Sequence, residues 1–344
     1  MSIRTNRRKF GARGRLAALT LVVAGLVLGA CGSKQDDPDT RPQTERLELM
    51  LDFYPNADHA PIYAAQEIGA FRDAGLDVKI RTPADPGMPI KMVTTGRVDL
   101  AISYEPEVLL ARDKGARVAS VGALVQKPLT SIMTLRDDIR SVKDLAGKTV
   151  GTAGIPYQSA YLRTALEKAA VNPDRVREVN VGFNLSQAML SKKVDATLGG
   201  FWNYEGVQLR RRGRKPRIIR MEQVGVPTYQ ELVFVGHMDT LRERGRVLRR
   251  FLQAVARGAR ALRTDPTVGL DTLLKANPDL ERGLQQAVVK ETLPVFFPEG
   301  DFPWGYQNAD EWKAYGEWML ENKLLQAMPS PTALTNEFLP GHGV

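Results

Sequence analysis

The chain reads GRVDLAISYEPEVLLARDKG at residues 96–115 and KKVDATLGGFWNYEGVQLRRRG at residues 192–213. In each stretch a Val-Asp pair leads into a short apolar run that predicts a strand. A segment with apolar residues at helical spacing follows and ends at a glycine, Gly115 or Gly213. The two stretches predict the same strand–helix unit twice, so two similar lobes are the natural interpretation.

The rest of the chain continues the alternation of strands and helices. Strands are predicted at residues 47–51, 76–82, 99–103, 117–125, 148–151, 176–181, 195–199 and 217–221, and helices at 61–71, 88–95, 107–114, 161–170, 186–192 and 205–212. From residue 240 onward the pattern is helical, ending with a helix at 308–322. Such alternation is typical of an α/β protein with open, doubly wound sheets.

The length supports two lobes, because the roughly 300 residues after residue 44 are too many for one ordinary core. Two short apolar runs, Ser131–Leu135 and Glu231–Val235, are the candidate hinge strands. They predict a first lobe of residues 45–130 plus 235–344 and a second lobe of residues 131–234. A ligand cleft is expected between the lobes, since ligands bind beyond the carboxyl ends of strands in open α/β sheets.

The first 31 residues differ from the rest of the chain. A basic head without acidic residues precedes the apolar run Leu16–Ala30, as in a secretory signal peptide. The run ends in Leu28-Gly29-Ala30-Cys31, which resembles the lipobox of bacterial lipoproteins and implies lipidation at Cys31. The alternative is a transmembrane anchor with an incidental cysteine. Residues 32–44 are polar and predict a flexible tether.

The formal charge of +9 overstates how basic the exported chain is. Six basic residues lie in the head of the signal peptide and leave about +3 for the remainder, so nucleic-acid binding is not expected. A dense basic run at 210–217 is interpreted as a solvated helix end and loop, with a surface that meets a permease or anionic headgroups as the alternative.

Motifs for catalysis and metal binding are missing from the sequence. The three histidines, His59, His237 and His342, are far apart, and Cys31 is the only cysteine. A Walker loop, a nucleophile elbow and an HExxH pair are absent from the sequence, so it predicts neither ATP hydrolysis nor a cofactor or metal. These observations favour a binding protein over an enzyme.

Two segments carry candidate binding residues. The first, residues 52–63, reads DFYPNADHAPIY: Pro55 and Asn56 end the strand, Asp58 could cap the following helix, and Asn56 and His59 could meet a small ligand. The alternative is a capped turn in which His59 donates to nearby backbone.

The second segment, residues 199–205, reads GGFWNYE. Its two glycines allow close backbone approach. Trp202 and Tyr204 offer faces for stacking, and Glu205 can accept hydrogen bonds from an amino-substituted heterocycle or take up a ring proton. The alternative is aromatic core packing, with Glu205 as a favourable charge at a helix start.

These segments, together with SYEPEV at 103–108 and VGALVQ at 121–126, resemble the thiamin-pyrimidine-precursor binding proteins and the yeast-type pyrimidine synthases related to them. The resemblance runs from about residue 47 to residue 297. It implies a type II periplasmic-binding fold with a pyrimidine such as formylaminopyrimidine or hydroxymethylpyrimidine in the cleft. Phe53 departs from the family, which often has tryptophan there.

The resemblance also implies the site and its setting. Residues near the ligand would be Asn56, His59, Tyr104, Glu105, Tyr157, Trp202, Asn203, Tyr204 and Glu205. The chain would be a monomeric, lipid-anchored component of an ABC importer on the outer face of the cell membrane, docking on a permease whose ATPase is a separate chain. Three alternatives stay open: a riboflavin importer, a lipoprotein without a small ligand, and a pyrimidine synthase that consumes His59, although its cysteine-rich iron motif is absent from the sequence.

Overall fold

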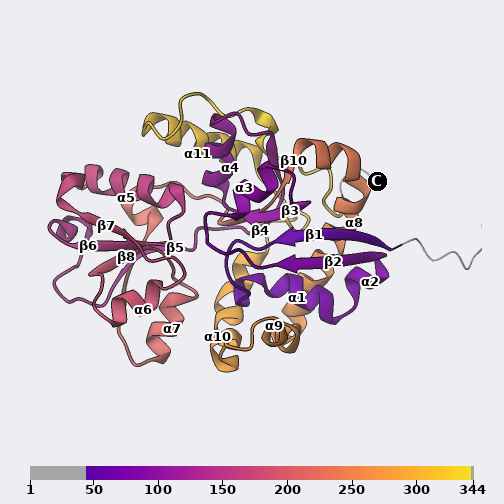
Figure 1. The fold of residues 1–344 in the computed structure, drawn as a ribbon, viewed down its shortest axis with the longest axis horizontal. Coiled ribbons are helices and arrows are strands. Elements are labelled where there is room, and N and C mark those ends of the chain that lie inside the picture. The colour runs from indigo at the N-terminus through magenta and orange to yellow at the C-terminus, as the bar shows by residue number, and fades with distance from the viewer. Residues whose placement is uncertain (1–43, 342–344) are drawn as a thin grey trace, which may run out of the picture. The chain divides into compact units, whose positions relative to one another are not determined.

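The computed structural model describes residues 44–341, so the predicted signal peptide, Cys31 and nearly all of the tether lie outside the described part. The described residues form two five-stranded mixed sheets with helices packed on them (Figure 1). The expectation of an α/β protein with two open sheets is confirmed.

The first sheet has the order β2-β1-β3-β10-β4. Its strands are β1 (Glu45–Met50), β2 (Leu76–Arg81), β3 (Leu100–Ser103), β4 (Val118–Val125) and β10 (Leu232–His237). β1 pairs in parallel with β2 and β3, whereas β10 runs antiparallel to β3 and β4. β3 and β4 are buried along their whole length, as expected for strands covered on both faces.

The second sheet has the order β7-β6-β8-β5-β9 and repeats the first. Its strands are β5 (Thr130–Thr134), β6 (Thr149–Thr152), β7 (Arg177–Asn180), β8 (Ala196–Phe201) and β9 (Arg217–Arg220). Here too one antiparallel strand, β5, lies between its neighbours β8 and β9. The echo in the sequence therefore reflects equivalent topology, because β3 and β8 occupy the same place in their sheets.

Helices follow most strands, as the sequence predicted. Their bounds are α1 (Ala60–Glu67), α2 (Ala70–Asp73), α3 (Pro89–Thr94), α4 (Glu105–Asp113), α5 (Pro156–Lys168), α6 (Leu185–Leu190), α7 (Glu205–Arg211), α8 (Met238–Thr264), α9 (Leu270–Ala276), α10 (Arg282–Thr292) and α11 (Ala309–Glu321). The helix predicted at 61–71 is divided into α1 and α2 because Gly69 adopts a left-handed conformation, with φ at 74°. Among the described helices, none is long and apolar enough to cross a membrane.

The long helix α8 joins the C-terminal helices to the first sheet. Its buried stripe, including Leu248, Phe251 and Val255, packs on α1 and the sheet. Gly258 permits this crossing, since a Cβ there would lie 2.2 Å from the carbonyl oxygen of Pro61. The fold thus holds α1, and the loop before it, rigidly against the first sheet.

The chain passes between the sheets through two short segments. The predicted hinge strands overlap two strands of the sheets: β5 belongs to the second sheet and β10 to the first. The crossings are residues 126–129, between β4 and β5, and 225–231, which lead into β10. The buried carboxylate of Glu231 ties the crossings together by accepting from the backbone N–H of Leu129 at 2.6 Å and of Thr130 at 2.8 Å. We propose these segments as the lobe boundaries in place of 130/131 and 234/235.

Candidate ligand-binding site

An inner cavity lies where the carboxyl ends of strands from both sheets meet. Its volume is about 30 Å³, room for about two water molecules, so the inner cavity is too small for an aromatic ring. The lining residues are Asp52, Phe53, Asn56, Asp58 and Tyr104 from the first lobe and Ala153, Ile155, Gln158, Leu185, Gly199, Phe201, Tyr204 and Glu205 from the second. The predicted residues Asn56, Tyr104, Tyr204 and Glu205 thus face one cavity.

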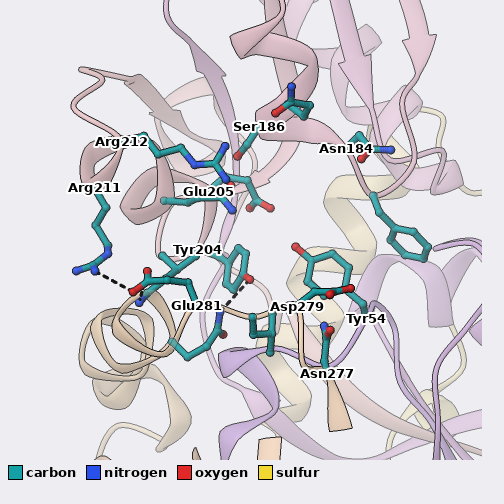
Figure 2. A pocket seen from close by; sticks show the side chains of 16 residues that line it. Tyr54, Asn184, Ser186, Tyr204, Glu205, Arg211, Arg212, Asn277, Asp279 and Glu281 are labelled. Carbon is teal, nitrogen blue, oxygen red and sulfur yellow. Dashed lines mark hydrogen bonds and ion pairs between the residues drawn. The ribbon is translucent and has the colours of Figure 1, made fainter. Parts of the chain in front are cut away.

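A larger outer cavity of about 720 Å³ opens beside the inner one (Figure 2). Tyr204 and Glu205 line both cavities. The remaining lining residues are Tyr54, Phe183, Asn184, Ser186, Gln187, Gln208, Arg211, Arg212, Asn277, Asp279, Leu280, Glu281, Leu284 and Gln285. The basic run at 210–217, interpreted from sequence as a solvated helix end, therefore also contributes to the wall of a cavity.

His59 lies behind the inner cavity and not at its surface. Its Nε2 is 2.8 Å from Oδ1 of Asp52, and its Nδ1 accepts from the backbone N–H of Asn56 at 3.3 Å. Because Nδ1 accepts, Nε2 is the nitrogen that donates to Asp52. The hydroxyl of Tyr104 donates to the other oxygen of Asp52 at 2.8 Å. The histidine is fully buried, and Asp52 separates it from the cavity.

Asp52 was not predicted from the sequence, although a signal was present. It stands two residues after the end of β1, at the carboxyl edge where ligands bind in open α/β sheets. Its two oxygens hold His59 and Tyr104 in place, so it organises the first-lobe wall of the cavity.

Asp58 does not cap α1 as predicted, since that helix begins without a side-chain cap. Asn56 instead caps the short 3-10 turn Ala57–His59 before it: Oδ1 of Asn56 accepts from the backbone N–H of Asp58 at 2.8 Å. The carboxylate of Asp58 instead accepts from Nδ2 of Asn203 in the other lobe at 2.5 Å. Burial raises the pKa of Asp58 to about 7.

Glu205 is the first residue of α7 and reaches back over the preceding turn. Its Oε2 accepts from the backbone N–H of Phe201 at 2.7 Å. Burial outweighs such hydrogen bonds and raises the pKa of Glu205 to about 7. Near neutral pH this side chain can accept from an amino group as a carboxylate or donate to a ring nitrogen as an acid.

The predicted glycine approach is found at Gly199, where φ is 108° and a Cβ would lie 2.3 Å from Nε2 of Gln158. Only glycine adopts such a backbone readily. The close approach lets Gln158, another lining residue of the inner cavity, lie directly over β8.

Aromatic rings from both lobes meet at the boundary of the two cavities. The rings of Phe53 and Phe183 are 4.5 Å apart edge to face, and those of Tyr54 and Tyr204 are 6.3 Å apart. The hydroxyl of Tyr204 accepts from Nε2 of Gln285 at 3.2 Å. The sequence predicted Tyr204 here but missed Tyr54 and Phe183, which lies in a loop far from any motif.

Trp202, which the sequence offered together with Tyr204 as a stacking face, lines neither cavity, whereas Tyr204 lines both. Its indole N–H donates to the carbonyl oxygen of Pro128 at 2.9 Å, and the guanidinium of Arg220 lies 4.2 Å from its ring centroid. A tryptophan N–H needs a partner when it is partly buried, and here a crossing segment supplies it. Trp202 therefore contacts the hinge.

Three further predicted residues hold the lobes and do not face a cavity. Nδ2 of Asn203 donates to Asp58 and, at 2.6 Å, to Oγ1 of Thr292. Tyr157 donates to the hinge carboxylate of Glu231 at 3.3 Å. Glu105 accepts from the backbone N–H of Gln230 at 2.8 Å. The partners of these residues are groups of the protein itself.

The two lobes with a cleft between the carboxyl ends of their sheets define a periplasmic-binding-protein fold. Similar solved structures include the alkanesulfonate-binding protein from Xanthomonas axonopodis pv. citri bound to MOPS, with a TM-score of 0.63 and 17% identity over 84% of this chain and 98% of that one. A Candida albicans protein described as having the generic periplasmic binding protein fold has a TM-score of 0.64 and 17% identity, covering 87% of this chain and 98% of that one.

The chain belongs to the NMT1/THI5-like family, whose model matches residues 56–268. It is 35% identical to a formylaminopyrimidine-binding protein from Halalkalibacterium halodurans over 88% of this chain and 92% of the relative. It is 28% identical to a 4-amino-5-hydroxymethyl-2-methylpyrimidine phosphate synthase from Legionella pneumophila over 86% of this chain and 92% of that relative. The family thus includes proteins named as binders and proteins named as enzymes.

Proposed function

We propose that this chain captures a pyrimidine precursor of thiamin as the substrate-binding component of an ABC importer. The observation that carries the proposal is Glu205, a buried acid with a pKa near 7 that lines both cavities beside the ring of Tyr204. An aminopyrimidine offers the amino hydrogens and ring nitrogen that such a group binds, and a flat ring for the tyrosine. The similarity to a formylaminopyrimidine-binding protein supports the same ligand class.

The delivery of the ligand follows from the same proposal. Residues 1–31 direct export, Cys31 carries the lipid, and residues 32–44 tether the two lobes to the outer face of the membrane. The closed monomer docks on a permease whose partner ATPase is a separate chain. The signal-like N-terminal sequence and the missing Walker loop support this arrangement.

The surroundings of His59 favour capture over catalysis. A synthase that consumed this histidine would need it at the substrate, but here it is fully buried and hydrogen-bonded at both ring nitrogens. The sequence also offers a single cysteine, Cys31, for iron binding. Incubation with iron and pyridoxal phosphate should leave the mass of the His59 peptide unchanged, and a modified His59 would favour the enzyme.

The proposal is tested by thermal melting of the chain begun after Cys31. Hydroxymethylpyrimidine, formylaminopyrimidine, thiamin and riboflavin are each added to ligand-free protein. A ligand at about a hundred times its Kd stabilises by roughly 2.7 kcal/mol, a rise of a few degrees in a chain this size. A rise with a pyrimidine supports the proposal. A rise with riboflavin alone would make riboflavin the assigned ligand in place of a pyrimidine. No rise in melting temperature with any of the four would contradict the pyrimidine assignment.

A further inference from the structure

The second-lobe wall of the outer cavity carries a buried hydroxyl without a partner. Ser186 is 7% exposed, lines the outer cavity, and its Oγ makes no hydrogen bond to any described residue. A buried hydroxyl left unpaired costs about 1–3 kcal/mol, so a ligand atom that pairs with it gains correspondingly. Figure 2 shows Ser186 on the same side of the cavity as Glu205 and Arg212.

The polar groups of the two cavities differ in kind. Those of the inner cavity include three carboxyl groups, of Asp52, Asp58 and Glu205, which suit hydrogen-bond donors on a ligand. The outer wall around Ser186 offers donors, the side chains of Gln208 and Arg212 among them. A ligand that satisfies both regions has donors at one end and an acceptor at the other.

The fixed charges argue against a phosphate as that acceptor. The outer cavity contains two arginines, Arg211 and Arg212, and three acids, Glu205, Asp279 and Glu281. Arg211 is also engaged by Glu281 at 3.3 Å. A dianion would therefore meet more acidic than basic side chains, whereas a neutral carbonyl oxygen loses only its own hydration.

We infer that Ser186 is a specificity-determining residue whose hydroxyl donates to a carbonyl oxygen on the ligand's substituent. This rests on the proposed function and selects between its two pyrimidines. Ser186 lines only the outer cavity, whereas Glu205 lines both, so the acceptor lies on a substituent that extends beyond the ring. A formylaminomethyl group has such a carbonyl, whereas a hydroxymethyl group ends one atom beyond its methylene carbon.

Calorimetric titration of the full chain in detergent tests this inference with three ligands: formylaminopyrimidine, hydroxymethylpyrimidine and hydroxymethylpyrimidine phosphate. Wild type should bind formylaminopyrimidine most tightly. Ser186→Ala should weaken that complex about tenfold, the worth of one hydrogen bond, and change hydroxymethylpyrimidine binding less than twofold. Ser186→Cys replaces the hydroxyl by a slightly larger thiol and should be intermediate, since a thiol is a weak donor.

The matched control is Ser191→Ala at the end of the same helix, where the hydroxyl donates to the carbonyl oxygen of Ala188 and lies outside both cavities. It should leave all affinities unchanged. An equal loss for both neutral pyrimidines in Ser186→Ala, no loss for either, or tightest binding of the phosphate would overturn the inference while leaving pyrimidine capture intact. If wild type binds none of the three, the proposed function fails and the inference falls with it.

Discussion

The polar side chains of the two cleft walls differ in how completely they are hydrogen-bonded within the protein. On the first-lobe wall the polar side chains are engaged within the protein: Asp52 holds His59 and Tyr104, and Asn56 bonds to the backbone on both sides of itself. On the second-lobe wall the hydroxyl of Ser186 has no partner among the described residues, and the carboxylate of Glu205 is bonded by backbone N–H groups, that of Phe201 among them. The two lobes have the same sheet topology, so this difference comes from the loops and not from the fold.

Two lobes with the same sheet topology can therefore have different roles in ligand binding. A wall whose hydrogen bonds are complete is preorganised, so its side chains lose little conformational entropy when a ligand binds. A wall with free capacity gains hydrogen bonds only when the ligand is present, so it determines which ligand is held. We therefore propose that the first lobe serves as the scaffold and that side chains of the second lobe determine which ligand is held.

The largest effect is expected at Glu205. Glu205→Ala should lower pyrimidine affinity about a hundredfold or more, because hydrogen bonds to a charged group are worth about 1.5–3 kcal/mol and several are lost together. Glu205→Gln should be intermediate, since the amide still accepts. Calorimetry checks the affinities and circular dichroism the fold; unchanged binding by a folded Glu205→Ala protein would mean that the second lobe does not read the ligand.

A change in the first-lobe scaffold should affect stability more than binding. His59→Ala removes a buried ring and leaves Asp52 with one partner fewer, which should cost about 2–3 kcal/mol of unfolding free energy. Pyrimidine affinity should fall less than in Glu205→Ala. Denaturant unfolding and calorimetry on one preparation measure both quantities, and a hundredfold loss of affinity at unchanged stability would place His59 at the ligand.

Trp202 and Tyr204, two of the three aromatic residues of the GGFWNYE segment, should differ in their effect on binding. Tyr204→Ala should weaken binding about tenfold, since it removes a ring that lines both cavities. Trp202→Ala should change affinity less, because that ring contacts Pro128 and Arg220 instead. A fluorescence titration compares them, and the reverse order would show that Trp202 and not Tyr204 stacks on the ligand.

The last expected effect concerns the stability of the ligand-free protein and its dependence on pH. Burial raises the pKa of Asp58, Glu107 and Glu205 from ordinary values of 3.8 to 4.5 to about 7. The stability from a raised pKa is fully present below the unfolded-state pKa and is lost as pH rises through the folded-state pKa. The melting temperature should therefore fall between pH 5 and pH 8.

Asp58→Asn tests the source of that fall. The amide oxygen still accepts from Asn203 but cannot ionise, so the decline with pH should become smaller. Asp137→Asn, at an exposed position of the second lobe, is the matched control and should leave the slope unchanged. A melting temperature that rises from pH 5 to pH 8 in wild type would contradict this account of the buried acids.

The sequence predicted the architecture because strand and helix periodicities are local. The βαβ alternation and the echo between residues 96–115 and 192–213 both correspond to observed elements. The lobe boundaries stay a prediction, because an apolar run such as 231–235 looks the same in a hinge strand as in a sheet strand. The strands that pair with such a run decide which of the two it is, and strand pairing depends on residues far apart in the sequence.

The site was predicted in part for the same reason. Glu205 and Tyr204 stand in a dense motif, so the sequence revealed them. Trp202 is only two residues from Tyr204, but the turn between them sends the two rings to different places. Ser186 has no sequence signal at all, because its lack of a partner depends on what the tertiary fold packs around it.

A crystal structure of the chain with formylaminopyrimidine bound would test the proposed ligand contacts. We expect an enlarged cleft with the pyrimidine between the lobes, its amino group on Glu205 and its ring against Tyr204, while Asp52, His59 and Tyr104 keep their hydrogen bonds to one another. A ligand bound directly to His59, or held by the first lobe with Glu205 unengaged, would contradict the proposed contacts.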